Sequence, residues 1–138
     1  MASNLVPKQE KLLTTDAWKL QTWKVALLTS TFAYNHAVHS TYASLTNEVV
    51  GTGYTAGGAV LAGKTSGYVD SATVRLTADN PEWGPGATFS NVKFVACYDD
   101  DVTAGKPLRA LFELTAAQSC TNSTFTVQWH ASGLVRIA

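Results

Sequence analysis

The sequence predicts a mainly β protein, an antiparallel β-sandwich or small barrel of about seven strands with a short N-terminal helix. Two observations lead to this class. Apolar and polar residues alternate in several short segments, as they do in a strand with one buried face. Clusters of Gly, Pro, Asn and Asp separate these segments and mark turns. We expect the 138 residues to form a single β-rich domain, residues 1–138.

The N-terminal segment, residues 1–20, is expected to be an arm or a short helix. Pro7 suits the first turn of a helix, where its missing N–H costs no hydrogen bond. Glu10 lies near the positive end of the helix dipole, and Leu12 and Leu13 supply a narrow apolar stripe. Because a helix this short is marginal in water, we expect it to dock on the domain.

Seven segments have the pattern or composition of strands. The first runs from Thr22 to Leu28 and places Trp23, Val25 and Leu27 on one face. The other six are Val60 to Thr65, Gly67 to Ala78, Val92 to Tyr98, Leu108 to Leu114, Thr124 to His130 and Leu134 to Ile137.

The connections are predicted from their turn residues. Residues 39–45 are expected to form one or two helical turns. Residues 51–58 contain four glycines and predict a turn-rich loop or a bulged strand. Residues 80–86 predict a turn that carries Trp83, and the run from Asp99 to Asp101 predicts a solvated hairpin tip.

The charge of the chain excludes several classes of protein. Ten basic and ten acidic residues give a net charge of zero, and only 14% of residues are charged. A nucleic-acid binder that depends on clustered Lys and Arg is therefore excluded. With 18 Thr, 19 Ala and 10 Gly, the surface is expected to consist of small neutral side chains. Such a surface is typical of a protein in contact with other copies, although it also fits a domain that merely carries few charges.

The sequence also predicts no membrane partner. The first residues lack the basic and apolar regions of a signal peptide, and no apolar stretch is long enough to cross a bilayer.

One motif suggests phosphate binding but lacks the required context. Residues 58–65 match the pattern G-x-x-x-x-G-K-[ST]. A phosphate loop needs a buried strand before it and a helix directly after it, so that backbone N–H groups meet the phosphates. Here a glycine-rich loop precedes the pattern and a predicted strand follows it. We therefore expect no nucleotide site.

The remaining reactive side chains predict neither catalysis nor a cofactor. His36 and His39 have a spacing that metal ligands can use, but surface or capping roles are favoured because no zincin glutamate accompanies them. The aspartates at 99–101 lack the ligand spacing of a calcium loop. Cys97 has no neighbouring base and is expected in the core. Whether it pairs with Cys120 is left open.

The aromatic residues divide into core and contact candidates. Trp23 and Trp129 lie on apolar strand faces and are expected in the core. Tyr54 and Trp83 lie in Gly- and Pro-rich segments, where a large aromatic side chain is either a lid over the core or an anchor for a partner.

Three stretches together resemble a family of small structural proteins of tailed bacteriophages. They are Trp23 to Ser30, Thr46 to Gly58 and Phe125 to Leu134, and the resemblance extends over nearly the whole chain from about Leu12. The glycine-rich stretch is its most specific part. The resemblance implies a β-rich virion component without enzymatic activity, made and assembled in the cytoplasm of the bacterial host.

Within that family, the size and neutrality of the chain look most like a capsid decoration, or cement, protein. The resemblance implies the major capsid protein as partner and self-association into a homodimer or homotrimer. The candidate contact residues are Tyr34, Tyr54 and Trp83. Tyr34 belongs to the loop at 31–39, which departs from the commoner pattern in being poor in acids. A tail-associated or fibre-base protein is one alternative, and a carbohydrate-binding sandwich that stacks Trp83 and Tyr54 on sugars is another.

Overall fold

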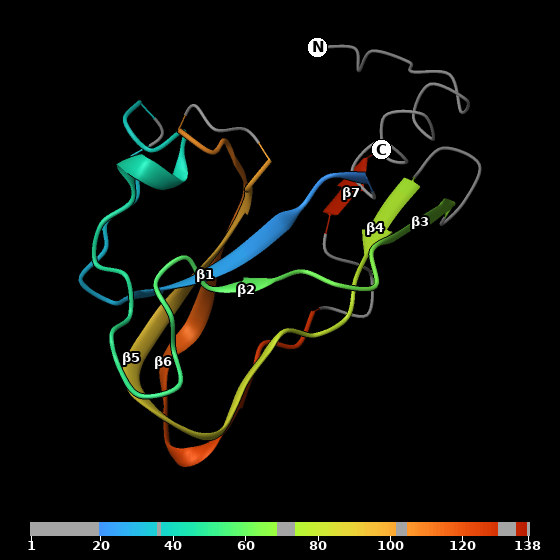
Figure 1. Ribbon diagram of the computed structural model, residues 1–138. Helices are drawn as coiled ribbons and strands as arrows, with labels where there is room; N and C mark the ends of the chain where they lie inside the picture. The colour runs from blue at the N-terminus through green and yellow to red at the C-terminus, as the bar shows by residue number, and fades with distance from the viewer. Residues whose placement is uncertain (1–19, 36, 69–73, 102–104, 130–134, 138) are drawn as a thin grey trace.

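The computed structural model describes residues 20–35, 37–68, 74–101, 105–129 and 135–137. The strands are β1 (Trp23–Thr29), β2 (Ala59–Val60), β3 (Thr65–Tyr68), β4 (Val74–Thr77), β5 (Glu82–Asp99), β6 (Leu108–Thr126) and β7 (Val135–Ile137), with one 3-10 turn, η1 (Tyr42–Ser44). All strand pairs are antiparallel. They form a sheet in the order β2-β1-β5-β6 and a second sheet in the order β3-β4-β7 (Figure 1). The prediction of a mainly β, antiparallel protein is confirmed.

A long bent hairpin, β5–β6, dominates the larger sheet. Its strands have 18 and 19 residues, and the pairing shifts register at several bulges. Both strands turn back at the lower end of the molecule in Figure 1. We call residues 92–99 and 108–113 the near half, because they adjoin the hairpin connection. Residues 82–91 and 114–126 are the far half.

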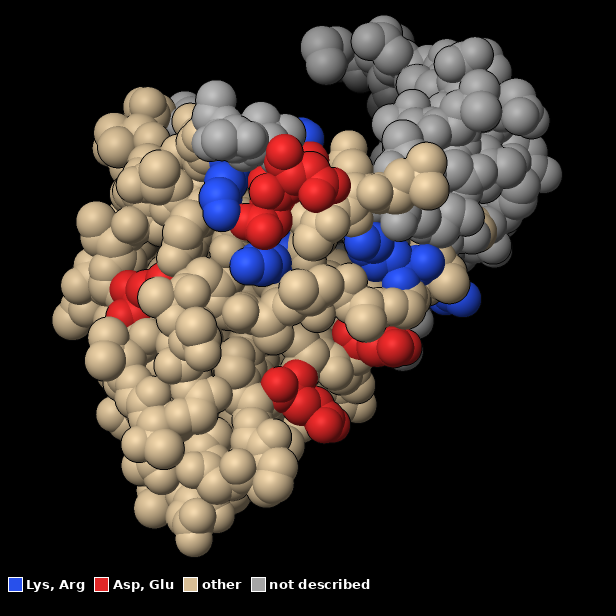
Figure 2. Space-filling model, viewed as in Figure 1, with Lys and Arg blue, Asp and Glu red and all other residues tan. Residues whose placement is uncertain are grey.

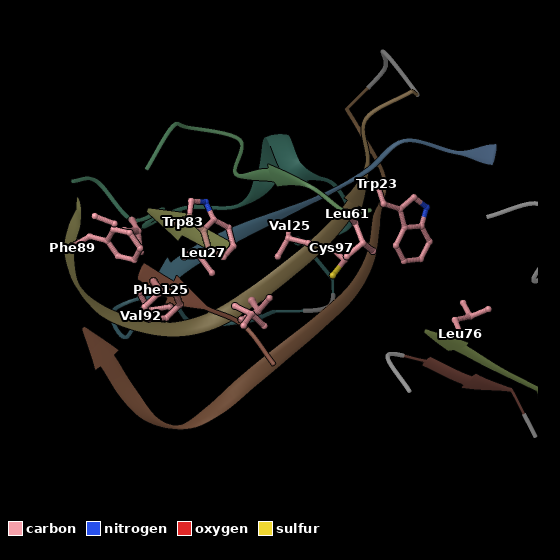
Figure 3. Close-up of a cluster of buried hydrophobic side chains, with 14 residues drawn as sticks. Trp23, Val25, Leu27, Leu61, Leu76, Trp83, Phe89, Val92, Cys97 and Phe125 are labelled. Atoms are coloured by element: carbon pink, nitrogen blue, oxygen red, sulfur yellow. The ribbon is translucent and has the colours of Figure 1, made fainter. Parts of the chain in front are cut away.

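The bend lets this one hairpin surround much of the main core. Val92, Val95 and Cys97 come from the near half, whereas Trp83 and Phe125 come from the far half, and all five belong to one buried cluster. Figure 3 shows Trp83 together with Leu27 of β1 in this cluster. The other members of the cluster are Trp23, Val25, Leu27, Val49, Leu61, Leu76, Ala87, Phe89 and Val127.

Strand β1 is buried on both faces. Trp23, Val25 and Leu27 face the main cluster, as their alternation predicts. Ala26 and Leu28 face the opposite way, into a second cluster. The loop and 3-10 turn at residues 31–45 supply Phe32, Tyr42 and Leu45 to this cluster, which β5 completes with Phe94, Ala96 and Tyr98 and β6 with Leu108 and Leu111.

The turn predicted at residues 80–86 is wrong. β5 begins at Glu82 and runs through this segment, with a cis peptide bond between Gly84 and Pro85. Gly84 and Gly86 have φ values of 121° and 82°, so they accommodate a backbone that other residues rarely adopt. A Cβ at Gly84 would lie 2.7 Å from the carbonyl oxygen of Ser123. Glycine and proline here bend a strand instead of ending it.

Other predicted boundaries need smaller corrections. Only the ends of the segment expected at 60–65 lie in strands, in β2 and β3, and the single strand expected at 67–78 is replaced by parts of the paired strands β3 and β4. The segment expected at 108–114 and the first three residues of that expected at 124–130 belong to the single strand β6. The helical turn within 39–45 is η1. The glycine-rich loop at 51–58 is irregular except for a bridge between Thr52 and Thr88. The N-terminal helix expected within 1–20 lies outside the described residues.

Within the described part of the chain, no helix is long and apolar enough to cross a bilayer.

Candidate functional site

The three predicted contact residues occupy different environments. Trp83 is only 5% exposed and packs against Phe125 at a ring distance of 6.2 Å. The ring of Trp83 belongs to the main core cluster, which favours the lid alternative over the anchor alternative. Tyr54 is half-buried, with its ring 6.1 Å from Trp83. Tyr34 is 52% exposed and is the only one of the three that presents a large surface to solvent.

The hydroxyl of Tyr54 belongs to a hydrogen-bonded group that we call the Glu48 cluster: Glu48, Tyr42, Tyr54, Tyr98 and Gly57. Tyr42 and Tyr54 donate to the two carboxylate oxygens of Glu48 at 2.7 and 2.8 Å. The Gly57 N–H donates to the same carboxylate at 2.7 Å, and the Tyr98 hydroxyl donates to the Gly57 carbonyl at 2.5 Å. Tyr42 and Tyr98 also stack at 4.4 Å.

These contacts give the Glu48 cluster a structural role, because they connect loops to the sheet. Burial, followed by the hydrogen bond to Glu48, raises the pKa of Tyr42 to about 12. Burial likewise raises the pKa values of Tyr54 and Tyr98. The phenols therefore remain protonated hydrogen-bond donors near neutral pH. Their hydrogen bonds hold the loops around residues 42–48 and 54–57 against β1 and β5.

Ion pairs close the connected end of the hairpin. Asp99, 2% exposed, lies 3.3 Å from the guanidinium of Arg109. Asp100 lies 2.5 Å from the ammonium of Lys106 and 3.5 Å from that of Lys24. The hydrogen bond from Lys106 is the main reason that the pKa of Asp100 is lowered.

The aspartate run is therefore not simply the solvated tip that the sequence predicts. Its first member is buried, and Asp101 accepts a hydrogen bond of 2.6 Å from the Thr22 N–H. Among the described residues, no group of three or more His, Cys, Asp or Glu side chains is arranged to hold a metal ion.

A groove of about 560 Å³, the Tyr34 groove, lies between the loop around residues 34–40 and the near half of the hairpin. Its aromatic wall contains Tyr34, His39 and Phe94, with Tyr34 stacked on His39 at 6.0 Å. The backbone N–H of Asn35 donates to Nδ1 of His39 at 2.9 Å and so orients the imidazole. The other lining residues are Ser40, Leu108, Arg109, Ala110, Leu111 and Glu113.

The Tyr34 groove joins residues that lie far apart in the sequence. Tyr34 is a predicted contact residue, but Arg109 and Glu113, about 75 positions later, attract attention only as polar members of an alternating strand. No local pattern indicates that they share a groove with Tyr34. The combination of aromatic, aliphatic and charged lining suits a protein segment as ligand.

A second groove, the β6 groove, follows the far half and has a volume of about 390 Å³. It contains no charged side chain. The lining residues are Leu114, Gln118, Ser119, Cys120, Ser123, Thr124, Phe125, Thr126, Val127 and Gln128.

Apart from Glu82, the far half contains no charged residue, and neighbouring segments of the chain are also uncharged. Residues 49–63, 83–92 and 114–129 contain no Asp, Glu, Lys or Arg. Figure 2 shows charged side chains over the upper and middle parts of the molecule and none at the lower tip, where the hairpin bends.

The motifs considered in the sequence have structural roles where they are described. Residues 58–65 pass through β2 and enter β3, without the helix that a phosphate loop requires. The ammonium of Lys64 donates to the Gln21 carbonyl. His36 lies outside the described residues.

The two cysteines differ in environment and are both free. Cys97 is 0% exposed, and burial raises the pKa of its thiol to about 12. Cys120 is half-buried in the lining of the β6 groove. The question left open by the sequence is answered: they do not pair with each other.

Comparison with known proteins finds no match among family models, curated proteins or solved structures.

Proposed function

We propose that the chain is a structural protein of a tailed-bacteriophage virion, specifically a capsid decoration or cement protein bound to the outer shell. The observation that supports this is the uncharged surface around the far half, combined with a net charge of zero. Small neutral side chains pack closely against another protein without the cost of desolvating charges.

The proposed mechanism is thermodynamic and involves no chemical step. Each copy would bridge neighbouring subunits of the major capsid protein and add contact area that only the assembled shell offers. A ligand that binds one state stabilises that state by mass action. The protein would be made and assembled in the host cytoplasm and remain in the virion.

The proposal includes the finer architecture. The bent hairpin places its near and far halves around one core, as strands do when they pass from one layer of a sandwich to the other at a bulge. We therefore propose a sandwich or small barrel of about seven strands.

The Tyr34 groove is the proposed contact with the major capsid protein. Tyr34 is 52% exposed, and an amphipathic aromatic side chain beside a groove is a frequent anchor of protein interfaces. The groove also offers Arg109 and Glu113 at its edge, so a partner segment with apolar and polar side chains fits it.

The two alternatives differ in their support. A tail-associated or fibre-base protein would have the same neutral surface and is distinguished by copy number. The carbohydrate-binding alternative depends on Trp83 and Tyr54 as stacking platforms. Since Trp83 is 5% exposed and Tyr54 is held by Glu48, this alternative loses support.

The decisive experiment counts copies on purified particles of the phage that encodes the chain, by quantitative gel or electron microscopy. We expect a number comparable with that of the major capsid protein, because a cement protein occupies repeated shell positions. A few copies at one vertex would indicate the tail instead. Absence from mature particles would overturn the virion role.

The contact is tested by adding purified variants to particles that lack the protein. Tyr34→Ala is expected to lower occupancy at least tenfold, because loss of an interface anchor typically costs about 2 kcal/mol or more. Val38→Ala is the matched control, since Val38 lies in the same loop and is 57% exposed but does not line the groove. Equal occupancy for both variants would remove the Tyr34 groove from the proposal.

A further inference from the structure

Strand β6 is the last strand of the larger sheet, and no described strand pairs with its outer edge. In the order β2-β1-β5-β6 it pairs with β5 alone among the described strands. The beginning of that outer edge is covered, because the Leu108 N–H donates to the Ser40 carbonyl at 3.0 Å. Among the described residues, no comparable backbone bond covers the edge from residue 114 to 126.

Bulges interrupt the β5–β6 pairing along this edge, but the edge lacks the other protections that edge strands usually carry. Charged side chains, proline and short length prevent unwanted pairing with other chains. Residues 114–126 contain no charged residue and no proline. At the opposite side of the same sheet, the edge strand β2 has only 2 residues and is too short to pair readily with another chain.

The β6 groove opens along the same segment. Leu114, Phe125 and Val127 give it apolar lining, and Gln118 and Ser123 give it hydrogen-bonding groups without charge. A strand added to the β6 edge would place side chains near this groove, as in other cases of β-strand addition. The occupant that fits is a neutral strand.

We propose that two copies of this chain associate by antiparallel pairing of their β6 edges, residues 114–126, about a two-fold axis. A strand that pairs with its own copy in antiparallel orientation forms such an isologous interface directly. Residues 114–126 carry no charge and the chain has zero net charge, so the paired segments bring no like charges together. The biological use of this dimer rests on the proposed virion role, whereas the pairing itself belongs to the isolated chain.

The first test measures the mass of the purified chain by sedimentation over a concentration series. We expect a species of twice 14.7 kDa for the unchanged protein. Thr121→Lys, which adds a charge to the exposed edge, is expected to weaken dimerisation at least tenfold. Thr55→Lys is the matched control, because Thr55 is also an exposed threonine and lies in the uncharged loop outside β6.

The second test uses Cys120, the middle residue of 114–126, as a reporter. An antiparallel two-fold pairing brings Cys120 of one copy close to Cys120 of the other, whereas Cys97 is buried. A short bismaleimide, to which each thiol adds without an oxidant, is expected to yield a covalent dimer. Cys120→Ser is expected to abolish this product.

Three results would overturn the inference: a single 14.7 kDa species at every concentration, a trimer, or a dimer that Thr121→Lys and Thr55→Lys weaken equally. Unfolding curves of both variants establish that they are folded. Since these measurements use the isolated protein, their failure leaves the count of copies on particles unaffected. Conversely, absence from particles would not remove a dimer observed in solution.

Discussion

The two halves of the β5–β6 hairpin differ in their pairing, burial and charge, although the same two strands form both. The near half pairs with β1 along one side, is covered by apolar clusters on both faces, and ends in the ion pairs of Asp99 and Asp100. The far half has no charged residue apart from Glu82, and no described strand pairs with its outer β6 edge. Charges thus lie where the chain fastens to itself, and neutral side chains lie where we propose that it meets other copies.

The largest effect is expected from Trp83→Ala in the far half. The side chain is 5% exposed and contacts Phe125 and Tyr54, so its removal leaves a large cavity. We expect a loss of about 3–5 kcal/mol in the free energy of unfolding, measured by denaturant titration. Trp129→Ala is the comparison, because Trp129 is only half-buried beside Phe112 and should cost less. If Trp83→Ala and Trp129→Ala lower the free energy of unfolding equally, then Trp83 contributes no more to the core than the half-buried Trp129.

A smaller loss is expected when the near half loses Arg109. The Arg109→Ala change leaves the carboxylate of Asp99, which is 2% exposed, without its cation. Leaving a buried acceptor without its partner costs about 1–3 kcal/mol.

Glu113→Ala provides the control for Arg109→Ala by thermal or denaturant unfolding. Its ion pair with Lys93 spans 3.9 Å, and the Glu113 side chain is 63% exposed. An exposed pair contributes about 0–1 kcal/mol. If both substitutions lower the free energy of unfolding equally, the Asp99–Arg109 ion pair does not stabilise the near half more than an exposed pair does.

Alkaline pH tests the Glu48 cluster, which holds loops against β1 and the near half. The pKa of Tyr42 is about 12 in the folded protein against 10.0 for an ordinary tyrosine. The folded state therefore retains the proton more strongly than the unfolded state. The contribution of the protonated Tyr42 phenol to stability is complete below pH 10 and is lost as the pH rises toward 12.

The measurement is the unfolding free energy of the unchanged protein and of Tyr42→Phe between pH 8 and 12, an interval chosen to bracket the tyrosine pKa values. The variant is expected to show a shallower decline, because Phe has no proton to lose. Identical slopes would show that Tyr42 does not carry the pH dependence.

The near half could be predicted from the sequence because its elements obey local rules. The alternation of Trp23, Val25 and Leu27 predicts the buried face of β1, and the apolar run at 92–98 predicts the part of β5 that pairs with it. In each case the pattern of neighbouring residues and the observed burial agree.

The far half could not be predicted in the same way. Gly84, Pro85 and Gly86 have the same local chemistry in a turn as in a strand bent at a bulge. The choice is made by pairing across the hairpin, such as that of Trp83 with Phe125, which no local pattern contains. The local chemistry therefore predicts a turn that carries Trp83 as a lid or an anchor, whereas Trp83 lies in strand β5 and in the core. The Tyr34 groove is likewise invisible in the sequence, because the position of its loop against β6 decides its lining.

The length of the hairpin also bears on when the β6 edge forms during folding. The pair Glu82 and Thr126 closes the far end of a hairpin whose first pair is Tyr98 and Leu108. Contacts between residues close in sequence form with a smaller loss of chain entropy than distant ones, so we expect the ladder to grow outward from the connection. The β6 edge at residues 114–126 would then be completed late in folding. The proposed dimer would therefore form between folded chains and not between folding intermediates.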